Sequence, residues 1–316
     1  MSLTAIVWGA GFVVGNRLLA NGFDKAPITL NTVRFAIGAL VLLAIFAKRL
    51  RFSKCTLIYG CIGGALLCIA FNMQILGLNV SQSPTECGFV TAAYSIFTPF
   101  ITWIFYKKRP GLLMFVGVAI AFAGLVVMNI DSLNLLENKY VFWGNMITLL
   151  GTVFFAVQIV LGDFALHEKK LDMITLTVTQ IVSCAILMGL ASVIFECKTY
   201  STLEIDWSNS WWLLLIVSLG GTSFAYFSQT YAQQHISPTE IAILMAFESP
   251  VGAILSISLG LDKLTWSVIV GGILILVAIV IIEILPSIIT KIKSKGHAEV
   301  DNDAEQHDDV DPPNEQ

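Results

Sequence analysis

SPTECGFVTAAYSIFTPFITWIFY, residues 83–106, begins with Ser-Pro-Thr-Glu, and the same four residues begin a second apolar run at residues 237–240. Ser at the N-cap, Pro at the first helical position and Glu three residues after the Ser are typical of a helix start with a capping box. The two copies lie 154 residues apart, about half of the chain. If five membrane crossings separate them, an odd number, the second half is inverted relative to the first, as in many transporters.

The composition is that of a membrane protein. Of the 316 residues, 56% are hydrophobic and only 13% are charged, and the mean hydropathy is +0.80. Soluble globular domains do not reach these values. A helix needs roughly 20 apolar residues to cross a bilayer core of about 30 Å. Ten stretches fit this length: 3–20, 28–47, 57–78, 85–106, 111–130, 141–161, 173–195, 211–232, 239–260 and 265–285. They are continuous rather than strictly alternating, which favours helices over a β-barrel.

Positive charges indicate the orientation of these ten predicted helices. If the N-terminus is cytoplasmic, the inner segments carry twelve Lys and Arg residues and the outer loops carry four. Cytoplasmic loops are enriched in these residues, so we predict that both termini are cytoplasmic. The chain is then a multi-pass protein of a cell membrane, expected to be a bacterial inner or plasma membrane.

Other short matches between the two halves extend the repeat. Ile28-Thr29-Leu30 recurs at residues 174–176, and Gly117 pairs with Gly271. We therefore predict two inverted five-helix repeats. The predicted units are a first repeat at 1–130, an external linker at 131–140, a second repeat at 141–290 and a disordered acidic cytoplasmic tail at 291–316.

Several motifs in both halves resemble one known family. They are Trp8-Gly9 with Phe12, Arg34-Phe35, Gln74-x-x-Gly77-Leu78, Gly88-Phe89-x-Thr91-Ala92, Pro99, Lys107-Lys108-Arg109-Pro110 and Phe247-Glu248-Ser249-Pro250. Together they resemble the EamA family of the drug/metabolite transporter superfamily over residues 1–285. The resemblance implies a transporter, in a family associated with the export of metabolites, amino acids and drugs. The chain departs from the family at the Glu-Arg-Leu that follows the fourth and ninth helices in many members. Here Lys108-Arg109-Pro110 and Asp262-Lys263-Leu264 take its place.

Glu248 is the first candidate site residue. It stands nine residues into the ninth predicted helix, about 14 Å along it at 1.5 Å per residue, and so near the midplane where transporters bind substrate. A carboxyl there would suit a proton-coupling site or a counter-ion for an amine. The alternative is a protonated carboxyl that is hydrogen-bonded between helices.

Arg34 lies six residues into the second predicted helix and stays charged in any environment. It would bind a carboxylate or phosphate, or pair with Glu248 as a gate. Alternatively, it extends its charged end to the outer interface.

Tyr226 and Gln229 belong to a polar stripe on the eighth predicted helix, where helical spacing places them on one face. Gln74 stands in a similar setting to Gln229, and Gln180 occupies the position equivalent to Arg34. We predict that these four residues approach a central cavity, although helix packing would also explain a polar stripe.

Trp8 and Tyr94 are further candidates for substrate contact, with packing between helices as the alternative. No nucleophile with a base, zinc spacing or phosphate-binding glycine loop occurs in the sequence, so we expect neither an enzyme nor a metal or other cofactor. The expected partners are a small-molecule substrate, the lipid bilayer, and a proton or counter-solute, without nucleic acid; the oligomeric state is left open.

The sequence thus predicts a secondary active transporter, working by alternating access, that exports a small organic metabolite such as an amino acid or a related amphipathic solute. The alternative is a non-transporting membrane sensor or scaffold that uses the acidic tail.

Overall fold

A computed structural model describes residues 2–107, 112–128 and 139–281. Within these ranges every regular element is a helix, which confirms the all-helical prediction for this part of the chain. The predicted acidic tail and residues 131–138 of the predicted linker lie outside them. The last two linker residues, Lys139 and Tyr140, begin a helix instead.

The helices of the first half are α1 Ser2–Leu18 with the π-helical turn Leu19–Phe23, α2 Pro27–Phe46, α3 Lys54–Ser81, α4 Pro84–Thr91, α5 Tyr94–Tyr106 and α6 Leu112–Met128. Those of the second half are α7 Lys139–His167, α8 Met173–Glu196, α9 Trp207–Ser218 with the π-helical turn Leu219–Phe224, α10 Ala225–Gln233, α11 Pro238–Ala246, α12 Glu248–Ser258 and α13 Trp266–Ile279. Short 3-10 turns follow α2 and α8.

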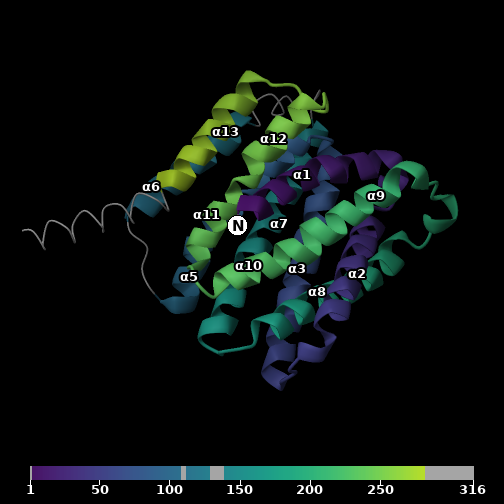
Figure 1. The fold of residues 1–316 in the computed structure, drawn as a ribbon. Helices are drawn as coiled ribbons and strands as arrows, with labels where there is room; N and C mark the ends of the chain where they lie inside the picture. The colour runs from purple at the N-terminus through teal and green to yellow at the C-terminus, as the bar shows by residue number, and fades with distance from the viewer. Residues whose placement is uncertain (1, 108–111, 129–138, 282–316) are drawn as a thin grey trace, which may run out of the picture.

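Eight helical segments in the described ranges are long and apolar enough to cross a membrane. They are Leu3–Phe23, Pro27–Arg49, Lys54–Ser81, Pro84–Tyr106, Lys139–His167, Met173–Glu196, Trp207–Gln233 and Pro238–Ser258. The fifth and tenth predicted helices correspond to α6 and α13, whose apolar helical stretches are shorter. These two helices pack along each other at one edge of the molecule (Figure 1).

Both helices that begin with Ser-Pro-Thr-Glu are broken, where the sequence predicts continuous helices. The first breaks between α4 and α5 and the second between α11 and α12. Ala93 and Phe247, which precede α5 and α12, are 154 residues apart and have nearly the same φ and ψ, −61° and −13° against −61° and −12°. Pro250 explains the second break, because it has no N–H to donate to the carbonyl of Ala246.

Side-chain caps begin both broken helices, as the sequence predicts. The hydroxyl of Ser83 accepts a hydrogen bond from the backbone N–H of Glu86, and Ser237 does the same for Glu240. At the second start the carboxylate of Glu240 also accepts from the N–H of Ser237 (2.8 Å), which completes a capping box. At the first start the carboxylate of Glu86 instead accepts a hydrogen bond from Asn145 of α7.

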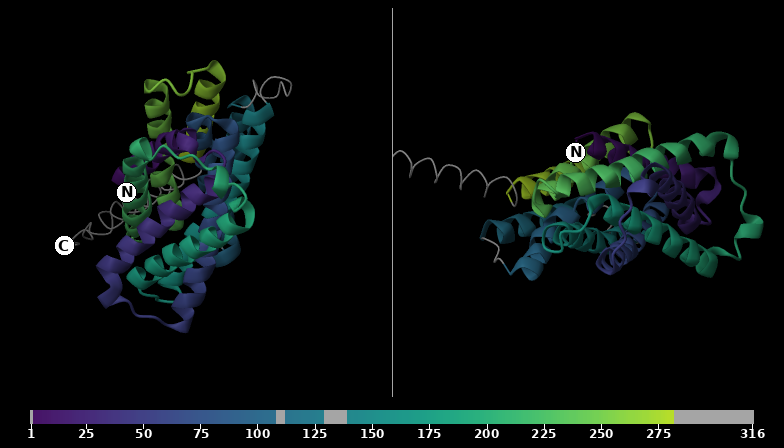
Figure 2. Two further views of the ribbon diagram at one scale, coloured as in Figure 1. Left: turned by 90° about the vertical axis from the view of Figure 1, so that its right-hand side faces the viewer. Right: turned by 60° about the horizontal axis from the view of Figure 1, so that its bottom comes forward.

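The most extensive contacts in the molecule are those of α3 with α7 and α8, and glycines make them possible. A Cβ atom on Gly64 would lie 2.0 Å from Oγ of Ser183, and one on Gly77 would lie 2.1 Å from Oγ1 of Thr148. Because no side chain fits at either position, the backbones approach closely. Figure 2 shows the resulting bundle from two further sides.

Candidate functional site

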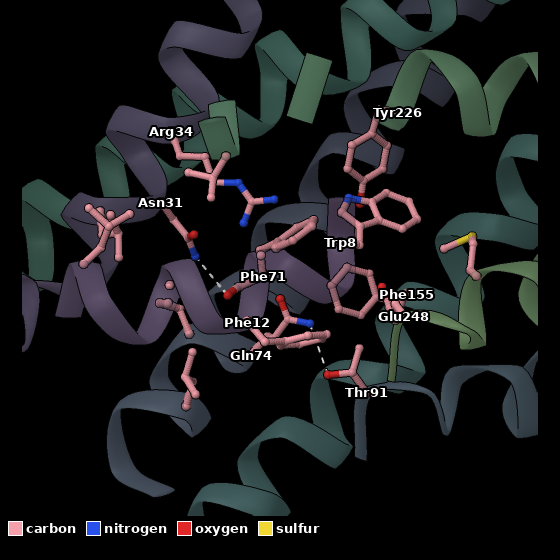
Figure 3. Close-up of a pocket in the computed structure, with 18 of the residues that line it drawn as sticks. Trp8, Phe12, Asn31, Arg34, Phe71, Gln74, Thr91, Phe155, Tyr226 and Glu248 are labelled. Carbon is pink, nitrogen blue, oxygen red and sulfur yellow. Dashed lines mark hydrogen bonds between the residues drawn. The ribbon is translucent and has the colours of Figure 1, made fainter. Parts of the chain in front are cut away.

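A cavity lies among helices of both halves of the chain. Its walls are mostly apolar and aromatic, with a few polar groups, as is usual for small-molecule sites. Six of the eight predicted site residues line it: Trp8, Arg34, Gln74, Tyr94, Tyr226 and Glu248. Figure 3 shows five of these side chains converging from several helices: Trp8, Arg34, Gln74, Tyr226 and Glu248.

The π-helical turn between α9 and α10 shapes one wall of this cavity. The carbonyl of Gly221 in this turn accepts two side-chain hydrogen bonds, from Nε1 of Trp8 (2.8 Å) and Nη2 of Arg34 (3.2 Å). The hydroxyl of Thr222 accepts a third, from Nε of Arg34 (2.9 Å). In a regular α-helix the carbonyl of Gly221 would accept a hydrogen bond from a backbone N–H one turn later. The widened turn leaves this carbonyl available as an acceptor in the site.

Arg34 therefore points into the cavity and not to the edge of the bundle, which removes the interfacial alternative. The sequence also suggests that it pairs with Glu248. In the described part of the chain, an ion pair joins only His167 and Asp163, and none joins Arg34 to Glu248. Both side chains line the same cavity, with no ion pair between them (Figure 3).

Aromatic rings lie beside these two side chains. Trp8 and Tyr226 meet edge to face with 5.5 Å between ring centroids, and Phe71 lies in the same way against Phe155 (4.9 Å) and Tyr226 (6.0 Å). Edge-to-face pairs of this kind fix the positions of the rings. Four aromatic side chains of the cavity wall thus pack against one another.

Glu248 and Tyr94 occupy corresponding places at the two helix breaks. Each is the first residue after a break, Tyr94 in α5 and Glu248 in α12. The hydroxyl of Tyr94 lies within reach of the Glu248 carboxyl, and both side chains are buried. The breaks thus bring a phenol from the first half to a carboxyl from the second.

Gln74 is held in the cavity wall by a hydrogen bond. Its Nε2 donates to the hydroxyl of Thr91 (3.1 Å), the last residue of α4 (Figure 3). The Asn31 amide donates to the carbonyl of Phe71 (2.9 Å). These contacts leave the carbonyl oxygens of both amides near the cavity as acceptors.

Gln180 and Gln229 do not line the cavity, contrary to their prediction as substrate-binding residues. They belong to a separate buried network in which Gln158 donates to Gln180 (3.2 Å) and Gln229 donates to Gln158 (3.4 Å). Gln180 packs on Gly63 of α3, where a Cβ atom would lie 2.8 Å from its Nε2. The second half uses these amides to join α7, α8 and α10.

Other residues that line the cavity were not among the predicted site residues, and they include Asn31, Phe71, Thr91 and Phe155. Asn31 had a signal, because it is three residues before Arg34 and so shares its helix face. The two phenylalanines resemble many other apolar positions in the chain, and no pattern distinguishes them. Among the described residues, no group of three His, Cys, Asp or Glu side chains could hold a metal ion.

The sequence model of the EamA-like transporter family matches residues 1–130 and 142–284, most of the chain. The chain belongs to the EamA-like transporter family. An uncharacterized transporter of Archaeoglobus fulgidus is 26% identical over 286 residues, which cover 90% of this chain and 84% of that protein. A crystal structure described only as that of a protein shares the fold, with a TM-score of 0.59 at 16% identity over 90% of this chain and 97% of its own.

Family membership and the apolar helices together make the chain a multi-pass membrane transporter rather than a member of an enzyme family. The description of the Archaeoglobus fulgidus transporter gives no solute. The chemistry of the cavity is therefore the guide to what this transporter carries.

Proposed function

We propose that this EamA-like protein is a secondary active transporter that exports a small organic metabolite, such as an amino acid or a related amphipathic solute, by alternating access. The observation that carries the proposal is the cavity itself. It lies between the two halves, has aromatic walls, and contains Arg34 and Glu248 without an ion pair between them. A solute with apolar and polar parts complements such a site.

Packing between the halves supports two inverted repeats of five spans, with α6 and α13 counted as spans. α1 packs on α12, and α7 packs on α4 and α5; α2 packs on α9 and its π-helical turn, and α8 packs on α3. α6 packs on α13. Each contact thus has a counterpart with the halves exchanged, as a pseudo-twofold axis in the membrane plane requires. With Lys and Arg enriched on one side, both termini are cytoplasmic in this arrangement.

The two helix breaks support alternating access. Discontinuous helices at the substrate site are a general feature of secondary transporters. Here both breaks reach the cavity, through Thr91 and Tyr94 in the first half and through Met245 and Glu248 in the second. We assign ion coupling to Glu248, because it is the buried carboxyl that the cavity contains.

The test is Glu248→Gln in proteoliposomes, with Glu240→Gln as the matched control. Glu240 has the same chemistry but is exposed at a helix start, away from the cavity. A mixture of radiolabelled amino acids and small carboxylates is loaded, and efflux is followed with and without a pH gradient. We expect Glu248→Gln to abolish the flux or its response to the gradient, and Glu240→Gln to keep both. Unchanged, still pH-dependent flux in Glu248→Gln would rule out the coupling role.

A further inference from the structure

The guanidinium of Arg34 has one edge in use and one edge free. Nε and Nη2 form the edge that meets the π-helical turn, where Thr222 and Gly221 accept their hydrogen bonds. The other edge, between Nη1 and Nη2, has no hydrogen-bond acceptor among the described residues. Because the group is planar and rigid, fixing one edge also fixes the direction of the other.

Aromatic rings lie close to the same guanidinium. Its central carbon lies 4.8 Å from the ring centroid of Phe71 and 5.4 Å from that of Phe35, within cation–π range. Figure 3 shows the group directed into the cavity, beside Phe71. Rings beside the guanidinium restrict ligand access, so a polar ligand must approach the free edge in its plane.

The positive charge of Arg34 also lacks a compensating anion. Among the described residues no carboxylate lies within ion-pair distance of it, and its partners are a neutral carbonyl, a hydroxyl and aromatic rings. An ion in a low-dielectric site is costly unless a counter-charge accompanies it. A bound anion would supply that counter-charge.

We propose that the free edge of Arg34 binds the carboxylate of the transported solute through two parallel hydrogen bonds. This inference rests on the proposed transport function and names its substrate class, an organic carboxylate. The two oxygens of a planar carboxylate match the end-on pair of N–H donors in spacing and in plane. The compact apolar part of the solute then contacts Leu18, Leu30, Leu78 and Val217, which line the same cavity.

Thr222 is a positioning residue in this proposal, because it holds Arg34 without touching the solute. Its hydroxyl accepts from Nε of Arg34, and no other side-chain oxygen of the described chain does so. Replacing Thr222 with Val keeps the shape of the side chain and removes the acceptor. The guanidinium would then rotate away from the direction that suits a carboxylate.

The experiment uses the full chain, purified in detergent, and pairs of probes that share a carbon skeleton. The acids are straight, branched and aromatic carboxylic acids of four to nine carbons, with and without an α-amino group. Each acid is compared with its primary amide and with the corresponding phosphonate. Binding is read as a shift in the unfolding temperature, which rises when a ligand binds the native state. Proteoliposome efflux of the best probe then gives KM and maximal rate.

We expect at least one carboxylate to stabilise the wild type while its amide does not. Arg34→Gln should remove this stabilisation, and Arg34→Lys should weaken it because a single ammonium cannot make the paired contact. Thr222→Val should raise KM about tenfold with a maximal rate close to that of the wild type. A pure packing role for Thr222 would instead lower the amount of folded protein and leave KM unchanged.

Several results would overturn the inference. They are stabilisation by an amide equal to that by its acid, retained binding in Arg34→Gln, a preference for phosphonates, and the absence of binding by every carboxylate. The proposed function fails separately. Carboxylate binding without flux in any gradient would reject transport and keep the Arg34 site, whereas flux of amides alone would reject the Arg34 site and keep transport.

Discussion

The carboxylate of Asp262 accepts a hydrogen bond from the backbone N–H of Thr85, 177 residues earlier in the chain, at 2.8 Å. Asp262 follows α12, and Thr85 lies in the first turn of α4. The same carboxylate oxygen accepts from the hydroxyl of Ser256 (2.7 Å). The first Ser-Pro-Thr-Glu helix is thus capped in part by the other half of the protein, whereas the second completes its own capping box.

Replacing Asp262 with Ala should lower the free energy of unfolding by about 1–2 kcal/mol, the usual cost of a lost N-terminal cap. Asp262→Asn keeps an acceptor oxygen and should lose less. The measurement is thermal unfolding in detergent, followed by circular dichroism. A melting temperature for Asp262→Ala equal to that of the wild type would show that solvent replaces the carboxylate at no cost.

Gly64→Ala should destabilise the protein by about 2 kcal/mol or more, because the new methyl group would overlap Oγ of Ser183 and the backbone carbonyl of Gln180. Gly189→Ala on α8 is the matched control. A Cβ atom there would meet only Thr32, at an ordinary 3.6 Å. We expect its melting temperature to equal that of the wild type. Similar melting temperatures for the two variants would mean that α3 and α8 can separate without loss.

Glu196 links the end of α8 to the start of α2. Its carboxylate accepts from the backbone N–H groups of Ile28 and Thr29, both at 2.7 Å, and from the hydroxyl of Thr29. Glu196→Ala would leave buried donors without a partner and should cost about 2–3 kcal/mol of stability. The control is Glu204→Ala, at an exposed residue of the segment between α8 and α9. Equal unfolding curves for the two variants would contradict this structural role.

The buried glutamines offer a test that separates stability from binding. Gln180→Ala should lower the melting temperature, because it removes the acceptor for Gln158, and should leave KM for the transported solute within about twofold of the wild type. Gln74→Ala should raise KM with less effect on melting, since Gln74 lines the cavity. Both values come from melting curves and efflux assays on the same preparations. A large rise in KM for Gln180→Ala would return that residue to the substrate site.

Local sequence rules predicted the helix starts well and the helix interruptions poorly. Ser83 and Ser237 cap their helices as the Ser-Pro-Thr-Glu pattern indicates, because capping depends on neighbours within one turn. The second break has a local cause in Pro250, but Ile96 stands at the corresponding place in the first half. At the first break the hydroxyl of Ser95 donates to the carbonyl of Ala92 (2.7 Å), a bond within one turn that competes with the hydrogen bonds of the helix backbone.

Some residues of the candidate site were predictable from the sequence and others were not. Charged residues in an apolar chain are conspicuous, and Arg34 and Glu248 both line the cavity. Gln180 and Gln229 are equally polar but are hydrogen-bonded through Gln158, a pairing between helices that no sequence spacing reveals. The π-helical turn that holds Arg34 was likewise invisible, because Gly220 and Gly221 are two among many glycines.

The interruptions of the two Ser-Pro-Thr-Glu helices have a mechanical consequence. A continuous helix that spans a membrane resists bending, so a displacement of one end tilts the whole helix and moves the other end. A helix without an unbroken hydrogen-bond ladder at its centre bends there, and its two segments can turn separately. Both breaks border the cavity, so a solute bound there in the proposed way would sit beside the joints of both helices, and turning of their outer segments would reach the two membrane surfaces.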